Sequence, residues 1–213
     1  LQLKPRDMWR NFRAVGLGRA PSAGLPGAAA GNLRPYQHWR RIEQATMSYG
    51  YGLSASLLQL AQVYTIFAND GVFVPATIHE RGAARVHGRR IYSARVAREV
   101  LAMLESVVSK DGTAPQAQVA GYTVAGKTGT AYRWTAKGYD HSQYRASFVG
   151  IVPASAPRVI IAVSIDRPST GSHFGGAVSG PAFAKIAART MHILNVSPNE
   201  LTANELYSQA PAT

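Results

Sequence analysis

The chain has 213 residues, of which 46% are hydrophobic and 16% charged, and these proportions exclude a chain that is disordered throughout. No apolar run approaches the roughly 18 residues needed to cross a bilayer, and the absence of cysteine excludes disulfides and thiolate metal sites. The formal net charge of +12 is large enough to suit a polyanionic partner.

The N-terminal region is predicted to be a lead-in to the folded body. Residues 1–13 carry four basic side chains and no apolar segment, so they predict neither a secretion signal nor a membrane anchor. They start without methionine and read as the interior of a helix, so we expect a piece of a longer protein. Residues 15–41 are rich in Gly, Pro and Ala without a helix or strand period, which predicts extended surface chain over most of the lead-in, residues 1–41.

Two amphipathic helices are predicted next. The first follows a capping box formed by Ser56 and Gln59 and stops at Gly71, with one apolar face made by Leu57, Leu60, Ala61, Tyr64, Phe67 and Ala68. The second starts after Ser93 and ends by Gly112, with inward positions at Val96, Val100, Met103, Leu104 and Val107.

The densest basic stretch, residues 81–98, begins between the two predicted helices and ends within the second one. It has no interleaved aromatic residue except Tyr92, and no zinc-finger, KH or RNP pattern accompanies it. We therefore predict a solvated basic face and no nucleic-acid partner. An arginine-rich nucleic-acid-binding module remains the alternative from another functional class, and salt-sensitive binding to random duplex DNA would favour it.

The second half of the chain predicts an antiparallel sheet. Strand-like segments cover residues 122–132, 144–153 and 158–166, and the last is a nearly continuous apolar run, typical of a strand covered on both faces. The short spacers suit antiparallel neighbours. A closing helix carries Pro181 in its first turn and a stripe of Phe183, Ile186, Ala187, Thr190 and Leu194.

These elements predict an α+β fold, an antiparallel sheet flanked by helices. The sequence shows no internal repeat and no boundary between domains. We therefore expect one partial domain: the lead-in, a body at residues 42–195, and a polar tail at residues 196–213.

Residues 121–128, "GYTVAGKT", match the phosphate-loop pattern G-x-x-x-x-G-K-[ST]. A phosphate loop needs a buried strand before the first glycine and a helix starting at the lysine. Here a polar, turn-rich segment comes before, and a strand-like "TGTAY" comes after. We interpret the match as accidental, and a magnesium-ATP titration without heat or thermal shift would dismiss an ATPase.

The same residues make chemical sense as a strand, because alternation places Lys127 and Gly129 on one side and Thr128 and Thr130 on the other. A glycine in a strand lets another backbone approach closely. An extended peptide could pair with this edge while the two hydroxyls and the ammonium hold its carboxylate. The Thr130 N–H could also help to stabilise an oxyanion.

Three blocks of the sequence resemble those of a known protein family. "VAGKTGTA" resembles the KTG box of the penicillin-recognising serine acyltransferases. "TMSYGYGLSASLLQLAQVYTIFANDGVFV" before it is similar to the corresponding part of class B penicillin-binding proteins. "SFVGIVPASAPRVIIAVSIDRP" and the following "FGG" look like their last two strands and turn. The resemblance points to a division-specific (septal) peptidoglycan D,D-transpeptidase with a partial β-lactamase/transpeptidase-like fold. A serine β-lactamase shares the KTG box, but the class B blocks argue against it.

The resemblance implies roles for individual residues. Lys127 would support the proton relay electrostatically, and Thr128, Gly129 and Thr130 would bind the carboxylate of the substrate. In the "STGSHFGG" bend, His173 and Phe174 would border the substrate groove, although a surface-turn role is equally possible on the sequence alone.

Two other boxes of the family are absent from the chain. No serine is followed by lysine three places later. The one Ser-x-Asn, Ser197-Pro198-Asn199, follows the KTG box instead of preceding it, so we interpret it as a chance match. We expect both boxes upstream of Leu1 and predict that residues 1–213 alone will not be labelled by a fluorescent penicillin, whereas a longer parent would be.

The sequence also gives expectations about metals, ligands, partner proteins and cellular location. The six histidines show no H-E-x-x-H or i, i+4 pair, so we predict no metal site, and no cofactor is implied. The resemblance implies peptidoglycan stem peptides ending in D-Ala-D-Ala as substrate, β-lactam antibiotics as ligands of the parent, and membrane proteins of the division machinery as partners. It also implies a parent on the periplasmic face of the inner membrane of a Gram-negative bacterium.

Overall fold

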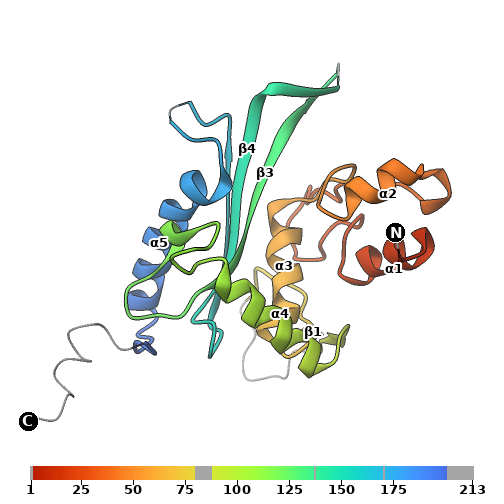
Figure 1. The fold of residues 1–213 in the computed structure, drawn as a ribbon. Coiled ribbons are helices and arrows are strands. Elements are labelled where there is room, and N and C mark those ends of the chain that lie inside the picture. Colours follow the sequence, from red (N-terminus) through yellow and green to blue (C-terminus); the bar gives the residue numbers. More distant parts are fainter. Residues whose placement is uncertain (1, 80–87, 137, 170, 201–213) are drawn as a thin grey trace, which may run out of the picture. The chain divides into compact units, whose positions relative to one another are not determined.

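The computed structural model describes residues 2–79, 88–136, 138–169 and 171–200, and the chain divides into two compact units. Unit 1 comprises Leu1–Ala97 and unit 2 comprises Arg98–Thr213. Figure 1 labels the main elements of each unit. The assignment of the whole chain to part of one domain stays a prediction.

Unit 1 is mainly helical, with one small two-stranded sheet. Its elements are α1 (Pro5–Ala14), the 3-10 turn η1 (Tyr36–His38), α2 (Arg41–Met47), α3 (Leu57–Ala68), β1 (Val72–Phe73) and β2 (Arg89–Arg90). The helical character of the first residues is confirmed by α1, whereas α2 was not predicted. The loop between α1 and α2 is otherwise irregular, as expected. The first part of the basic stretch, residues 81–87, lies outside the described residues.

Helix α3 has the predicted N-terminus but buries a different face. The Ser56 hydroxyl accepts a hydrogen bond from the Gln59 N–H at 3.2 Å, and the Gln59 side-chain oxygen accepts one from the Ser56 N–H at 2.7 Å, so the capping box is confirmed. Ile66 is fully buried with Val15 and Leu17, whereas Leu57, predicted to face inward, is 42% exposed. The buried face of α3 therefore differs from the apolar stripe that the sequence predicts.

The buried amide of Gln59 explains this difference. It donates to the carbonyl oxygens of Gly16, Arg19 and Ala30 at 3.3, 3.0 and 2.9 Å. Backbone carbonyls of a long loop need hydrogen-bond partners when they are covered. A polar side chain therefore occupies an inward position of α3 and fixes the irregular loop of residues 15–41 against the helix.

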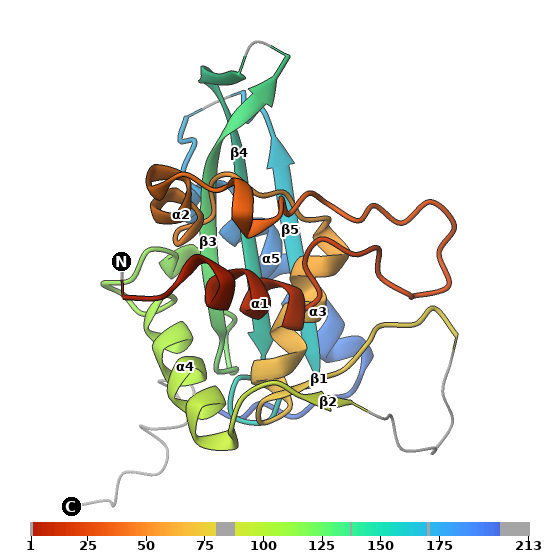
Figure 2. The same cartoon turned by 90° about the vertical axis from the view of Figure 1, so that its right-hand side faces the viewer.

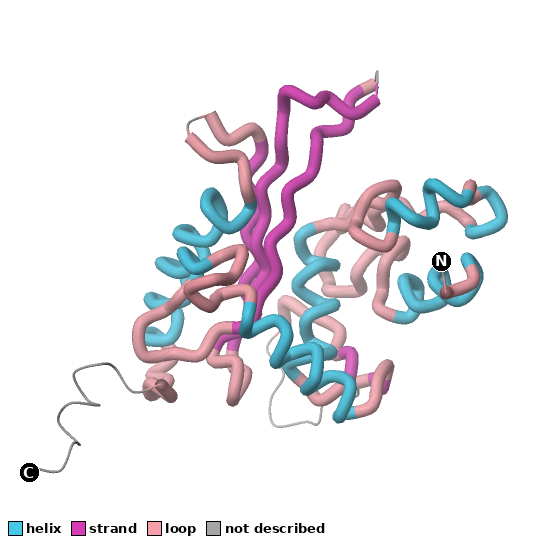
Figure 3. The backbone as a smooth tube through the Cα atoms, in the orientation of Figure 1, coloured by secondary structure: helices cyan, strands magenta, loops and turns pink. Residues whose placement is uncertain are grey.

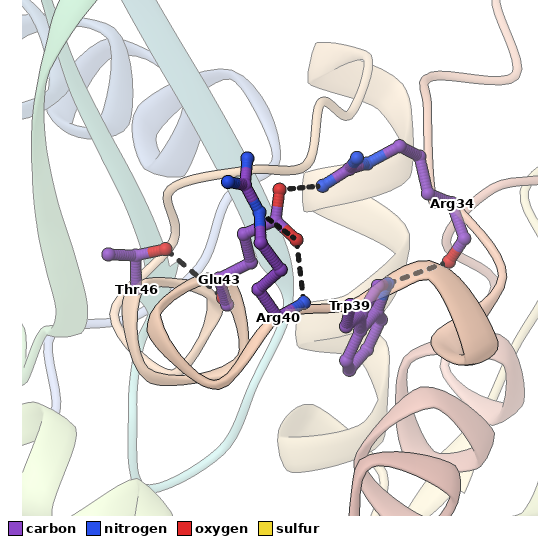
Figure 4. A network of polar contacts seen from close by, with 5 residues as sticks. All are labelled: Arg34, Trp39, Arg40, Glu43 and Thr46. Carbon is purple, nitrogen blue, oxygen red and sulfur yellow. Dashed lines mark hydrogen bonds and ion pairs between the residues drawn. The ribbon is translucent and has the colours of Figure 1, made fainter.

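A second polar network orders the start of α2 (Figure 4). One Glu43 carboxylate oxygen accepts from the Arg34 guanidinium at 2.6 Å, and the other accepts from the Arg40 N–H at 2.7 Å. The Trp39 indole N–H donates to the Arg34 carbonyl at 3.0 Å. The hydrogen bonds from the Arg40 N–H and the Arg34 guanidinium, with the charges of these two arginines, lower the pKa of Glu43 from its ordinary value of 4.5.

This network predicts a pH dependence of α2. Because the pKa of Glu43 is lower in the folded state, its contribution to stability is complete above the unfolded pKa and is lost as pH falls through the folded pKa. In the full-length protein, hydrogen exchange of the α2 amides is expected to accelerate as pH falls below about 4.5, after correction for intrinsic rates. Glu43→Gln should flatten this profile. An unchanged profile in that variant would contradict the assignment.

Unit 2 contains a three-stranded antiparallel sheet covered on one face by a long helix. It holds most of α4 (Ala94–Ser106), η2 (Pro115–Ala117), β3 (Ala125–Thr135), β4 (Gly138–Val152), β5 (Val159–Asp166) and α5 (Gly175–Ile193). The strand order is β3-β4-β5, with β4 in the middle (Figure 2). All three predicted strands, their antiparallel pairing and the α+β class are confirmed.

The β3–β4 hairpin is longer than predicted. Its strands run to Thr135 and from Gly138, and a register shift lies between Tyr132 and Arg133. The hairpin extends well beyond the end of β5 (Figures 1 and 3). The central strand β4 is buried over most of its C-terminal half. No residue of β5 is buried, so the prediction that β5 is covered on both faces is wrong for the described chain.

The core of unit 2 lies between α5 and the sheet. The Phe148 and Phe183 rings meet edge to face at 4.8 Å, and both side chains are fully buried. The buried stripe of α5 is Gly176, Ser179, Gly180, Phe183, Ala187 and Met191. Ile186 and Leu194, predicted to be in this stripe, are 47% and 46% exposed. Glycine and serine mark the true stripe because the helix approaches neighbouring backbone too closely for apolar side chains.

Two smaller predictions about the helices also need correction. The Ser93 hydroxyl accepts from the Val96 N–H at 3.3 Å, as expected of an N-cap, but Met103 of α4 is 65% exposed and is not a core residue. Pro181 lies inside α5, beyond its first turn. In the described part of the chain, no helix is both long enough and apolar enough to span a bilayer.

The residues after α5 are fastened to the turn that precedes β3. The Tyr122 hydroxyl donates to the Val196 carbonyl at 2.6 Å. The Asn199 side chain accepts from the Thr123 N–H and donates to the hydroxyls of Thr123 and Ser155 at 2.8 and 2.5 Å. Asn199 is therefore a structural residue, in keeping with the interpretation of its Ser-x-Asn match as accidental.

Candidate active-site strand

Lys127 lies within β3 and does not open a helix. Its cross-strand partner is Val149, and the strand continues to Thr135. The ammonium is exposed and donates to the Thr128 carbonyl at 3.0 Å, with the Thr128 hydroxyl at 3.4 Å. Because a strand in place of a helix follows the lysine, the backbone of a phosphate loop is absent from residues 121–128. The interpretation of that motif as accidental is confirmed.

Thr130 ties this strand to the N-terminus of α5. Its hydroxyl oxygen accepts a hydrogen bond from the Gly175 N–H at 2.9 Å. The first N–H groups of a helix have no intrahelical partner, so this contact satisfies one of them. A threonine hydroxyl can accept and donate at once. Thr130 therefore retains its own proton for a ligand while it holds α5 against β3.

We expect Thr130→Val to destabilise the fold of unit 2. The valine has nearly the same shape but cannot accept from the Gly175 N–H, and an unpaired buried donor costs about 1–3 kcal/mol. Thr130→Ser keeps the acceptor and should lose much less. Urea unfolding of the full-length protein measures both changes, and equal losses for the two variants would rule out the hydrogen bond as the cause.

Two further segments meet at this strand, and the sequence analysis assigned no site residue to Thr113, Gly175 or Gly176. The Thr113 hydroxyl lies 3.4 Å from the Thr128 hydroxyl. An added Cβ at Gly175 would stand 2.5 Å from the carbonyl oxygens of both Gly129 and Ser147. Gly176 is likewise pressed against the carbonyl of Thr113. The glycine pair in "FGGA" was the available signal, because adjacent glycines at a helix start indicate close backbone approach.

His173 and Phe174 lie beside the strand in a row of rings. His173 stacks on Tyr144 with ring centroids 4.1 Å apart, and Phe174 follows at 4.4 Å from His173. Tyr144 in turn lies 5.2 Å from Tyr132 of β3. Phe174 is 61% exposed, so its ring is available to a ligand. The structure thus brings both predicted residues next to Thr130 through Gly175, which Phe174 directly precedes.

The described residues offer little other catalytic chemistry. Within residues 2–79, 88–136, 138–169 and 171–200, no group of three His, Asp or Glu side chains is placed to hold a metal ion. Ser147 lies opposite Gly129, and its hydroxyl is engaged as a donor to the Gly129 carbonyl at 3.3 Å. The candidate site is therefore a binding edge without a nucleophile in its described part.

The antiparallel sheet, its covering helix and the accessible Lys-Thr-Gly-Thr strand form the arrangement expected of the penicillin-recognising class that the sequence resembles. Residues 1–188 match the family model of the penicillin-binding protein transpeptidase domain. The chain belongs to this family.

Similar proteins support the same assignment. Over 198 residues the chain is 43% identical to PenA of Neisseria meningitidis, named a probable peptidoglycan D,D-transpeptidase, covering 92% of this chain and 34% of that protein. It is 38% identical to the peptidoglycan D,D-transpeptidase FtsI of Escherichia coli, covering 91% of this chain and 33% of that one. The chain therefore spans about a third of the length of these relatives.

A solved structure agrees in both fold and sequence. The transpeptidase domain of penicillin-binding protein 3 from Burkholderia pseudomallei superposes with a TM-score of 0.87 at 57% identity, covering 93% of this chain and 60% of that one. The fold of the chain is therefore the β-lactamase/transpeptidase-like fold that its sequence resembles, and the family prediction is confirmed.

Proposed function

We propose that this chain is the C-terminal part of a serine-type peptidoglycan D,D-transpeptidase that cross-links stem peptides. The observation that carries the proposal is the placement of Lys127, Thr128 and Thr130 along an accessible strand, with Thr130 anchored to α5 at 2.9 Å. Such an edge can pair with an extended peptide, and its hydroxyls can hold a terminal carboxylate. The family membership of the chain supports the same activity.

The residues of the chain would act on a peptide that ends in D-Ala-D-Ala. Thr128 and Thr130 donate hydrogen bonds to its carboxylate, and Gly129 leaves room for its backbone. A serine elsewhere in the protein attacks the penultimate carbonyl carbon, the C–N bond breaks, and the terminal D-Ala leaves as the free amine. An amine on a stem peptide of a neighbouring peptidoglycan chain then attacks the ester and releases the serine. Lys127 supplies a positive charge near the proton relay.

His173 and Phe174 would border the bound peptide at the helix end of this groove. The exposed Phe174 ring and the stacked His173 ring present apolar area beside Thr130. β-lactams would occupy the same groove, since the β-lactam carboxylate takes the place of the peptide carboxylate. The expected partners are membrane proteins of the division machinery. We place the activity at the septum, on the periplasmic face of the inner membrane.

Fluorescent penicillin labelling tests this function. The full-length protein is expected to form a covalent adduct that survives denaturing electrophoresis, and a peptide ending in D-Ala-D-Ala should slow its formation. Residues 1–213 alone should remain unlabelled, because no Ser-x-x-Lys box occurs in them. Labelling of the isolated chain, or no labelling of the full-length protein, would overturn the proposal. Rapid hydrolysis without a stable adduct would indicate a β-lactamase instead.

A further inference from the structure

The β3–β4 hairpin carries two groups of aromatic side chains, one beside the candidate site and one at its tip. Tyr132 lies two residues after Thr130 on β3, and Trp134 follows beyond the register shift between Tyr132 and Arg133. Tyr144 and Tyr139 stand opposite them on β4. His141, Tyr132, Tyr144, His173 and Phe174 form successive ring contacts at 4.3, 5.2, 4.1 and 4.4 Å. At the tip, the Trp134 and Tyr139 rings meet edge to face at 4.9 Å.

The tip pair is ordered but takes no part in a core. Trp134 is 69% exposed and Tyr139 is 39% exposed. The Thr135 hydroxyl donates to the Gly138 carbonyl at 2.9 Å, and Arg133 donates to the Gln143 side chain at 3.2 Å, so the hairpin around the rings is braced. Large aromatic surface held in water on a braced hairpin marks a contact site, because folding gains little from it.

The position of the pair fits the length of the proposed substrate. Ala125 and Gly126 are buried, so a peptide with its carboxylate at Thr130 can follow the strand only toward the tip. Trp134 lies four residues after Thr130 on β3, a rise of about 13 Å. An extended peptide of five residues spans roughly 17 Å. The tip rings therefore lie level with the far end of a stem peptide, where peptidoglycan joins the peptide to a sugar.

We propose that Trp134 and Tyr139 form a saccharide-binding platform for the sugar that carries the stem peptide. This deepens the proposed function and rests on it for the identity of the ligand. A pyranose ring presents C–H groups to an aromatic face and hydroxyls to water, so it matches partly exposed Trp and Tyr rings.

A bilayer is a poorer partner for the same surface. Asp140 is adjacent to Tyr139 on the tip, and two hydrogen bonds from Ser142 to one carboxylate oxygen, at 2.9 and 2.6 Å, lower the pKa of this carboxyl. Asp140 is therefore ionised at neutral pH, and burying an ionised carboxylate in lipid is costly. A hydrated saccharide leaves this charge in water.

Paired donor substrates test the proposal in the full-length protein. One donor is the stem peptide alone, and the other is the same peptide on its disaccharide. Release of the terminal D-Ala gives kcat/KM for each. The native protein should prefer the disaccharide donor by about three- to tenfold, equivalent to one aromatic stacking contact. Trp134→Ala should reduce this ratio to about one, whereas Tyr49→Ala, which removes another exposed ring, should preserve it.

Other readouts separate this idea from the proposed function. Penicillin labelling reports the Thr128–Thr130 site without any sugar, so its failure would refute the transpeptidase assignment alone. Titration of the peptide-free disaccharide, followed by tryptophan fluorescence, should give a saturable change that Trp134→Ala abolishes. No donor preference in the native protein, or an equal loss for both donors in Trp134→Ala, overturns the platform. Vesicle binding lost in Trp134→Ala, with the donor ratio preserved, would assign the rings to a membrane instead.

Discussion

Replacing Lys127 with alanine in the full-length protein is expected to lower the second-order rate of acylation by penicillin by on the order of 100-fold or more, the usual effect of removing a preorganised electrostatic group from an acyl-transfer site. The ammonium is exposed and is held 3.0 Å from the Thr128 carbonyl, so it lies at the edge where a carboxylate would bind. Since the side chain packs into no core, folding should be little affected.

A matched variant distinguishes local chemistry from net charge. Lys185→Ala removes an equal charge from an exposed position of α5 and should leave the acylation rate within about twofold of the native protein. Lys127→Arg keeps the charge but not the compact ammonium, and it should recover part of the lost rate. Stopped-flow fluorescence with a labelled penicillin gives all three rates. Equal rates for Lys127→Ala and Lys185→Ala would remove Lys127 from the site.

Gly175→Ala is expected to destabilise unit 2 by about 1–3 kcal/mol, the typical cost of overpacking, and to slow acylation as well. A Cβ at this position would stand 2.5 Å from two carbonyl oxygens, those of Gly129 and Ser147. Neither is a flexible side chain, so either α5 or the β3–β4 pair must move. Because Gly175 has no left-handed backbone angle, the effect is steric and owes nothing to backbone strain.

Gly129→Ala provides the comparison. Its Cβ would meet the Ser147 hydroxyl, which can rotate away, with no backbone atom among its near neighbours. We therefore expect a smaller loss of stability from Gly129→Ala than from Gly175→Ala. Urea unfolding of the full-length variants measures the difference. If Gly175→Ala unfolds at the native denaturant concentration, the close packing of α5 on β3 would not be a constraint on the site.

The candidate site was predicted from sequence as far as its strand, but its supports were not. Lys127, Thr128 and Thr130 form a contiguous motif, and a contiguous motif in a strand has a known alternation. Thr113 lies 14 residues before Lys127 in the sequence, and Gly175 lies 48 residues after it. No local pattern indicates that such segments meet. His173 and Phe174 were predicted through the family resemblance, whereas the row of rings beyond them was not.

The errors in the helices have a common physical origin. Met103, Ile186 and Leu194 are apolar and fit a helical period, yet they are exposed in the structure. Gln59 and Ser179 are polar and are buried. Periodicity assigns the inner face of a helix by hydrophobicity, but α3 covers loop carbonyls and α5 approaches backbone closely. Amide donors and small residues are needed at such contacts, and hydrophobic patterns do not report them.

The sequence alone determined the order of the main elements of the second half of the chain, the antiparallel strands, the rejection of a phosphate loop and the family. These depend on local properties: strand composition, short connections, and contiguous motifs whose geometry follows from the backbone. The tertiary structure alone decided which face of each helix is buried, that Gly175 and Thr113 support the lysine strand, and that aromatic rings from β3 and β4 contact one another along the hairpin. Those features depend on contacts between segments far apart in the chain, whose spacing no local pattern encodes.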